Sequence, residues 1–175
     1  MPVISKCLQI NMIGRNAYPT EMEFGTLKIH SRHLPHWEAE GAIYFVTFRA
    51  KNKILDVEEQ KIVLDHVVKG NEIFYTLIAI IVMPDHVHIL LFPLPSYTLR
   101  RIMKGIKGVA ARKINNLKGM NGTVWQDESF DRIIRDEKEL KVKLFYMLNN
   151  PVKQGLTDDP WNYHGWWFNQ KIIVW

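Results

Sequence analysis

Two long apolar runs, separated by a very short connection, constrain the fold of this chain most. The first, IFYTLIAIIVMP, ends at Pro84, and the second, HVHILLF, begins at His86. Apolar runs of this length that stop at a breaker are typical of buried β-strands. Strands this uniformly apolar have both faces covered or lie at the centre of a sheet. We therefore expect the fold to be built around this pair of strands.

The flanking patterns predict a split βαβ unit. The string AIYFVTF, residues 42–48, predicts a strand, and Asp56 is the expected N-cap of a helix that runs through Val68. Residues 98–118 have helical spacing, and SFDRIIR, residues 129–135, predicts a fourth, shorter strand. The order strand, helix, strand, strand, helix, strand predicts an α+β, ferredoxin-like fold. In that fold a four-stranded antiparallel sheet carries both helices on one face.

An additional C-terminal helix is expected after Asp136, whose carboxylate favours the positive end of a helix dipole. Pro151 disfavours helical geometry in the residue before it, so this helix is predicted to end around Asn149. We expect three parts in the chain: an irregular leader (1–32), a single catalytic domain (33–156) and an aromatic tail (157–175). The tail holds four of the six tryptophans.

Length, charge and cysteine content limit the class of protein. A chain of 175 residues suffices for one well-packed core, and its net charge of +5 favours a polyanionic partner, with nucleic acid the first candidate. The single cysteine, Cys7, excludes an internal disulfide and a cysteine-based zinc knuckle, so any metal must be held by nitrogen and oxygen. The N-terminal segment interrupts its apolar residues with polar ones and predicts neither a signal peptide nor a membrane span. These features indicate a cytoplasmic, nucleoid-associated protein.

His86 and His88 form a candidate metal site. Side chains alternate across a strand, so both imidazoles point to the same face at the start of the second apolar run. They can therefore share a divalent cation. Two half-buried histidines with protein partners are the alternative interpretation. Asp85, just before them, is either an oxygen ligand or a turn residue.

The C-terminal helix supplies two further polar groups. Its apolar stripe consists of Leu140, Leu144, Met147 and Leu148. Tyr146 lies roughly 140° around the helix from the middle of that stripe, on the side of Asn150, so a hydroxyl and an amide project together. Two imidazoles and an amide oxygen leave open positions on Mg²⁺ or Mn²⁺, which can polarise a phosphodiester that a phenol then attacks. The alternative is an interfacial tyrosine packed against the aromatic tail.

Three separated segments resemble one family. VMPDHVHILL, VWQDESFDRIIRDEKEL and YMLNNPVKQGL are similar to the single-tyrosine transposases of the HUH endonuclease superfamily, specifically the REP-associated branch, over roughly residues 33 to 165. The resemblance implies a ferredoxin-like domain that nicks single-stranded DNA beside a hairpin, with Mg²⁺ or Mn²⁺ and a 5′-phosphotyrosine intermediate. By position, His86, His88 and Asn150 match the metal ligands and Tyr146 the nucleophile.

The predicted DNA contacts lie on the helix at 98–118, which is rich in basic residues. The expected contacts are Arg100, Arg101, Lys104, Lys107 and Arg112. A solvated helix face is the alternative. The expected partner is single-stranded DNA with a hairpin or palindromic repeat, and the protein is expected to act as a monomer or homodimer. A water-using metal nuclease and a catalytically inactive hairpin-binding protein remain alternative functions.

Overall fold

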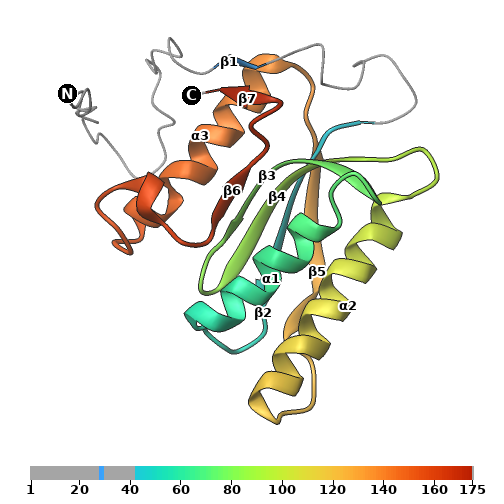
Figure 1. Cartoon of the computed structure of the whole chain (residues 1–175), viewed down its shortest axis with the longest axis vertical. Coiled ribbons are helices and arrows are strands. Elements are labelled where there is room, and N and C mark those ends of the chain that lie inside the picture. Colours follow the sequence, from blue (N-terminus) through green and yellow to red (C-terminus); the bar gives the residue numbers. More distant parts are fainter. Residues whose placement is uncertain (1–27, 30–41, 175) are drawn as a thin grey trace.

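The computed structural model describes residues 28–29 and 42–174, which form a five-stranded antiparallel sheet, a small two-stranded sheet and three α-helices (Figure 1). The strand order in the larger sheet is β5-β2-β4-β3-β6. The elements are β1 (Lys28–Ile29), β2 (Tyr44–Ala50), α1 (Val57–Lys69), β3 (Tyr75–Val82), β4 (His86–Pro93), α2 (Leu99–Lys118), β5 (Trp125–Ile133), α3 (Glu137–Lys153), a short 3₁₀ turn η2 (Pro160–Asn162), β6 (Trp166–Phe168) and β7 (Ile173–Val174).

The two long apolar runs form β3 and β4, which pair at the centre of the sheet, as predicted. A tight turn joins them, in which the amide of Met83 donates to the carbonyl of His86 at 2.8 Å. Ile80, Ile81, Ile89 and Leu90 are fully buried because both faces of this pair are covered. The turn fixes the start of β4, and with it the position of the two histidines.

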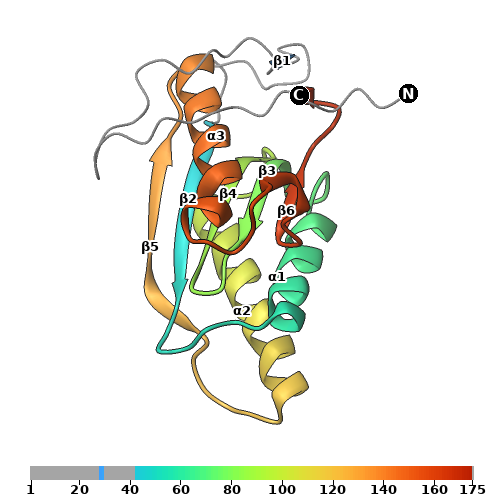
Figure 2. The same cartoon turned by 90° about the vertical axis from the view of Figure 1, so that its left-hand side faces the viewer.

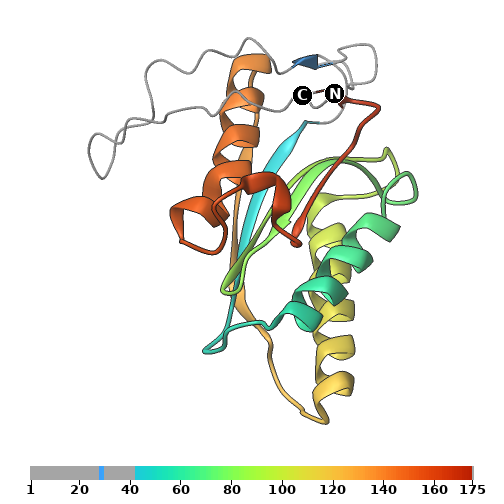
Figure 3. The same ribbon diagram turned by 60° about the vertical axis from the view of Figure 1, so that its left-hand side comes forward.

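Helices cover opposite faces of the sheet (Figure 3). α1 and α2 pack on one face, against a core that includes Val46, Ile89 and Ile106. α3 packs on the other face, where Leu144 joins a second core with Phe45. The predicted α+β, ferredoxin-like class is therefore confirmed, with α3 as the additional helix.

The predicted N-cap of the first helix is also correct. Asp56 is the N-cap of α1 and forms a capping box with Glu59, while Gly70 is the C-cap. Helix α2 covers the predicted range, with Thr98 as its N-cap.

The predicted number of strands was wrong, because the aromatic tail adds a fifth strand. Residues Trp166–Phe168 pair antiparallel with β3, and the amide of Val82 donates to the carbonyl of Gly165 at 2.8 Å. A three-residue strand is too short to show alternation in the sequence, but it satisfies backbone groups that an edge strand would leave unpaired. The fourth predicted strand is also longer than expected, since β5 already begins at Trp125.

The predicted end of the last helix was wrong as well. α3 continues through Pro151 to Lys153. A proline removes a single backbone donor, and the amides of Gln154 and Leu156 still bond to the carbonyls of Asn150 and Pro151 in the final turn. Asn150 therefore lies inside the helix and is buried.

The predicted leader, residues 1–32, lies almost entirely outside the described residues. Its one described segment, Lys28–Ile29, pairs with Ile173–Val174. Across residues 28–29 and 42–174, none of the helices combines the length and apolar character that a bilayer crossing requires.

Candidate active site

His86 and His88 lie at the start of strand β4, and their side chains point to the face that α3 covers. Their spacing predicts that both point to one face. Their ring centroids are 4.6 Å apart and the rings lie at 72° to each other. Both residues are only 4% exposed. The two imidazoles therefore form a compact pair in a largely buried position.

Each imidazole is held at Nδ1 by an oxygen from the protein. Nδ1 of His86 lies 2.6 Å from a carboxylate oxygen of Asp85 and Nδ1 of His88 lies 2.7 Å from the hydroxyl of Thr47. Because a carboxylate only accepts, Nδ1 of His86 donates this hydrogen bond, and Nε2 is the ring nitrogen that lies next to Asn150. The other carboxylate oxygen of Asp85 pairs with Arg49 at 3.2 Å. Both rings are thus oriented by a contact at Nδ1, on the side away from Nε2. This arrangement is common among metal-binding histidines.

The Nε2 atoms of the two histidines differ in their partners. The side-chain nitrogen of Asn150 lies 3.1 Å from Nε2 of His86. Nε2 of His88 is buried without a hydrogen-bond partner. A buried polar atom without a partner costs free energy, so this nitrogen indicates a site built for a ligand.

The electrostatic environment keeps His88 neutral. Burial is the main cause that lowers the pKa of His88 to about 3, and the nearby charges of His86, Arg49 and Lys143 lower it further. A histidine binds a metal through its neutral form. At physiological pH the lone pair of this ring therefore remains available.

The donor set fits a divalent cation. No group of three or more His, Cys, Asp and Glu side chains that could hold a metal occurs in the described part of the chain, so the third donor would be the amide of Asn150. Rotation of that amide would exchange its nitrogen for an oxygen donor. The amide oxygen suits Mn²⁺ or Mg²⁺ by ligand type, and the two imidazoles would add neutral nitrogen donors.

Tyr146 lies beside the imidazole pair. Its ring centroid is 5.2 Å from that of His88 and 6.2 Å from that of Phe45, which itself stacks on His88. The ammonium groups of Lys143 and Lys153 lie 5.8 and 5.7 Å from the ring centroid. The predicted apolar stripe of α3 is buried, and Tyr146 lies off it, half-buried at the margin of the same core. The structure thus brings Tyr146, His86, His88 and Asn150 together.

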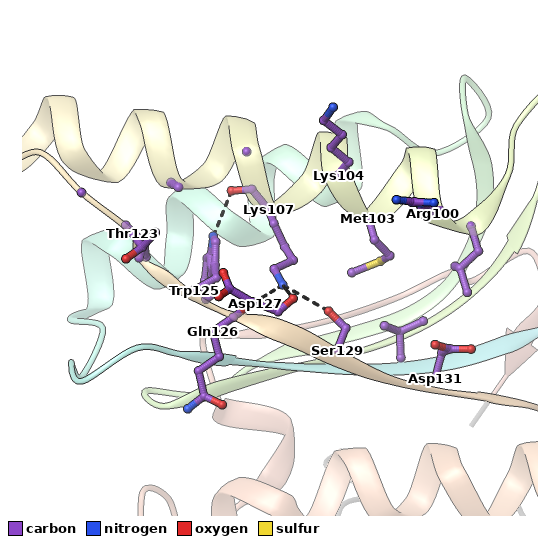
Figure 4. A pocket seen from close by; sticks show the side chains of 16 residues that line it. Arg100, Met103, Lys104, Lys107, Thr123, Trp125, Gln126, Asp127, Ser129 and Asp131 are labelled. Atoms are coloured by element: carbon purple, nitrogen blue, oxygen red, sulfur yellow. Dashed lines mark hydrogen bonds between the residues drawn. The ribbon is translucent and has the colours of Figure 1, made fainter.

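The predicted DNA-binding residues lie on the opposite face of the sheet. Arg100, Lys104 and Lys107 line a groove of about 770 Å³ between α2 and β5, and Figure 4 shows them along the α2 side. Arg101 and Arg112 are exposed on the same helix. The candidate active site and the basic helix are therefore separated by the thickness of the sheet.

Lys107 differs from the other basic residues of the groove. Its ammonium donates to the carbonyls of Gln126 and Asp127 at 2.7 and 3.0 Å, and to the hydroxyl of Ser129 at 3.3 Å (Figure 4). Burial lowers its pKa. These three contacts tie α2 to β5, so Lys107 has a structural role.

Sequence reasoning missed Thr47, Lys143 and Lys153, and it left the role of Asp85 open. The two lysines are three residues before and seven residues after Tyr146, a helical spacing that places them on its side of α3. That signal was present in the sequence. Thr47 could be found only from the register that sets it opposite His88.

A family model described as "Transposase IS200 like" matches residues 43–147. These residues include both histidines, Tyr146 and the whole central sheet apart from β6. The chain therefore belongs to the IS200-like transposase family.

Individual relatives agree with the predicted REP-associated branch. A Haemophilus influenzae protein named "Putative REP-associated tyrosine transposase" is 32% identical over 94 residues, which cover 46% of this chain and 52% of that protein. The match thus spans about half the length of the curated relative. A REP-associated tyrosine transposase solved bound to a REP hairpin has the same fold, with a TM-score of 0.61 and 20% identity over 73% of this chain and 77% of that one. A transposase structure from Deinococcus radiodurans covers 62% of this chain and 90% of that one, with 20% identity and a TM-score of 0.45.

Proposed function

We propose that this transposase-family protein is a metal-dependent endonuclease and strand transferase of single-stranded DNA, with Tyr146 as its nucleophile. The observation that carries the proposal is the approach of the Tyr146 ring to within 5.2 Å of His88, in a site whose second imidazole contacts Asn150. A phenol next to a candidate cation site is the combination that covalent attack on a phosphodiester requires.

The chemistry follows from this arrangement. The phenol oxygen of Tyr146 forms a bond to the scissile phosphorus and gives its proton to solvent. The bond from phosphorus to the 3′-oxygen breaks, and this oxygen takes a proton from solvent. The products are a 5′-phosphotyrosine and a free 3′-hydroxyl, and attack of a 3′-hydroxyl on the phosphotyrosine reverses the step and joins two strands. A bound Mg²⁺ or Mn²⁺ would supply Lewis-acid stabilisation of the phosphate charge.

The residues of the site have separate tasks in this proposal. His86, His88 and Asn150 would hold the cation, while Asp85 and Thr47 orient the two imidazoles through their Nδ1 atoms. Lys143 and Lys153 place two positive charges near the phenol, where they favour the approach of a phosphate. Phe45 stacks on His88 and helps to exclude water from its ring.

The proposed substrate is DNA that carries a hairpin or palindromic repeat beside a single-stranded segment. The solved relative of the same fold was bound to a REP hairpin. In this chain the exposed basic residues of α2, Arg100, Arg101, Lys104 and Arg112, are suited to phosphate contacts. We place such a protein with the nucleoid in the cytoplasm, acting as a monomer or homodimer.

The test uses a library of single-stranded oligonucleotides, each with a stable hairpin flanked by randomised sequence and a label at its 3′ end. With Mn²⁺, cleavage by Tyr146 transfers the labelled fragment to the protein, so a labelled band of protein size is expected on a denaturing gel. Tyr146→Phe is expected to give no such band, and EDTA is expected to abolish it. Tyr44→Phe is the matched control, because Tyr44 is half-buried and packs on the α1–α2 side of the sheet.

The alternative functions give different results. Cleavage without a protein-linked product would show a water-using nuclease. Hairpin binding that is indifferent to EDTA, with no cleavage under any metal, would show an inactive binding protein. An adduct that Tyr146→Phe still forms at the wild-type rate would refute the assigned nucleophile.

A further inference from the structure

Phe130 is a large aromatic residue that the core does not use. It lies on β5 and is 62% exposed, whereas Phe45 on the adjacent strand is 4% exposed. β5 is the outermost strand of the sheet, on the side away from β3 and β6 (Figure 2). α3 packs over β3, β4 and Phe45, so the aromatic ring of Phe130 stays open to solvent.

The sheet register connects Phe130 to the candidate active site. Phe130 is opposite Thr47, and Thr47 is opposite His88, so the three residues form one row across β5, β2 and β4. Residues that share such a row point to the same face, and adjacent strands are about 4.8 Å apart. The exposed ring therefore begins roughly 10 Å from the backbone of His88, on the face that carries Tyr146.

The side chains near Phe130 along β5 provide no unpaired cation for a phosphate. Glu128, two residues before it along the strand, is an exposed acid. The nearest arginine along the strand, Arg132, is engaged with Glu139 at 2.6 Å. What this position offers is an uncharged aromatic face, which suits the flat surface of a nucleobase.

Phe130 lies at the edge between the sheet face that carries α2 and the face that carries Tyr146. Ser129 and Asp131 line the groove beneath α2, while Phe130 between them points to the opposite face. β5 is thus the boundary between the basic helix and the candidate active site. A strand that runs from α2 around this edge to Tyr146 crosses β5 beside Phe130.

We propose that Phe130 is a stacking platform for an unpaired base of the DNA strand that passes around β5 to the active site. The inference rests on the proposed function, since it concerns the same substrate. Phe130 would be a positioning residue: a base stacked on it fixes how far the strand reaches, and hence which phosphate arrives at Tyr146.

The experiment measures binding to a single-stranded oligothymidylate and to an abasic oligomer of the same length, both in EDTA so that no cleavage occurs. Base–aromatic stacking contributes enough affinity that Phe130→Ala should weaken oligothymidylate binding about tenfold. Binding of the abasic oligomer should not change, and neither should the salt dependence of either affinity. The fluorescence of Phe130→Trp should be quenched when oligothymidylate binds.

Ile133→Ala is the matched control. Ile133 is 52% exposed on the same strand but on the opposite face, so its loss should leave both affinities unchanged. Equal weakening of both oligomers by Phe130→Ala, or a Phe130→Trp signal that oligothymidylate does not alter, would overturn the inference. So would a change in oligomeric state in place of a change in affinity, because it would show that a second copy of the chain covers the ring.

The two proposals fail separately. If Phe130→Ala binds oligothymidylate as tightly as the wild type does, while Tyr146 still forms the covalent adduct, the stacking proposal is wrong and the proposed nuclease function stands. If Phe130→Ala weakens binding of oligothymidylate but not of the abasic oligomer, and no covalent adduct forms, the proposed nuclease function is wrong and the stacking proposal stands.

Discussion

Thr47→Val tests whether the hydrogen bond behind His88 prepares that ring for a metal. The substitution keeps the shape of the side chain but removes the hydroxyl that lies 2.7 Å from Nδ1 of His88. His88 is 4% exposed and its Nε2 already lacks a partner, so the ring would then have no hydrogen bond among the described residues. An unsatisfied buried polar group costs about 1–3 kcal/mol, and the extra apolar group of valine offsets part of this. We expect a net loss of about 1 kcal/mol, or roughly 2–4 °C in Tm for a domain of this size.

The effect on metal binding should be larger than the effect on stability. Loss of a group that orients a metal-binding histidine typically weakens the metal 10–100-fold. Titration calorimetry with Mn²⁺ measures this directly, and thermal unfolding without metal measures the stability term.

Thr47→Ser supplies the control for this comparison. Serine keeps the hydroxyl and loses a methyl group, which costs up to about 0.8 kcal/mol if fully buried. The two variants should therefore have similar Tm values and very different Mn²⁺ affinities. If Thr47→Val binds Mn²⁺ as tightly as the wild type does, Thr47 does not orient His88 and the reasoning is wrong.

Two further substitutions test the groove and the added strand. Lys104→Met should weaken DNA binding and reduce its salt slope by about 1. Lys107→Met should lower Tm by roughly 2–4 °C, because the ammonium of Lys107 donates to carbonyls of β5. Equal salt slopes for both variants would contradict this division. Gly165→Ala places a Cβ 2.3 Å from the carbonyl oxygen of Val82 and 2.7 Å from the ring of Tyr163, so β6 must shift away from β3. Faster amide hydrogen exchange at Trp166–Phe168 is the expected result, and an unchanged exchange rate there would show that the strand tolerates the clash.

Local patterns in the sequence account for most of the fold. The apolar runs define β3 and β4, and capping residues define both ends of α1. These features depend on residues a few positions apart, so a single sequence contains them. The end of α3 was mispredicted because the cost of Pro151, a lost hydrogen bond and a steric clash in the preceding turn, is outweighed by burial of the surrounding helix.

Features that depend on pairing between distant segments could not be obtained this way. β6 has too few residues for a periodic signal, and its position is set by the free edge of β3. The contact between Thr47 and His88 spans 41 positions and depends on the register of β2 against β4. The sequence therefore predicted the residues that the structure brings together, but not the groups that hold them in place.

The fifth strand also affects how DNA can reach the candidate site. β6 and the segment around η2 cover the sheet beyond β3, and η2 packs beside α3. On the opposite side, β5 has no further strand beside it among the described residues. The basic helix and Tyr146 lie on different faces, so a strand that contacts both must go around one edge of the sheet, and both β5 and β6 are edge strands among the described residues. If Phe130 stacks a base as proposed, the strand takes the β5 edge rather than the edge at which the tail adds β6.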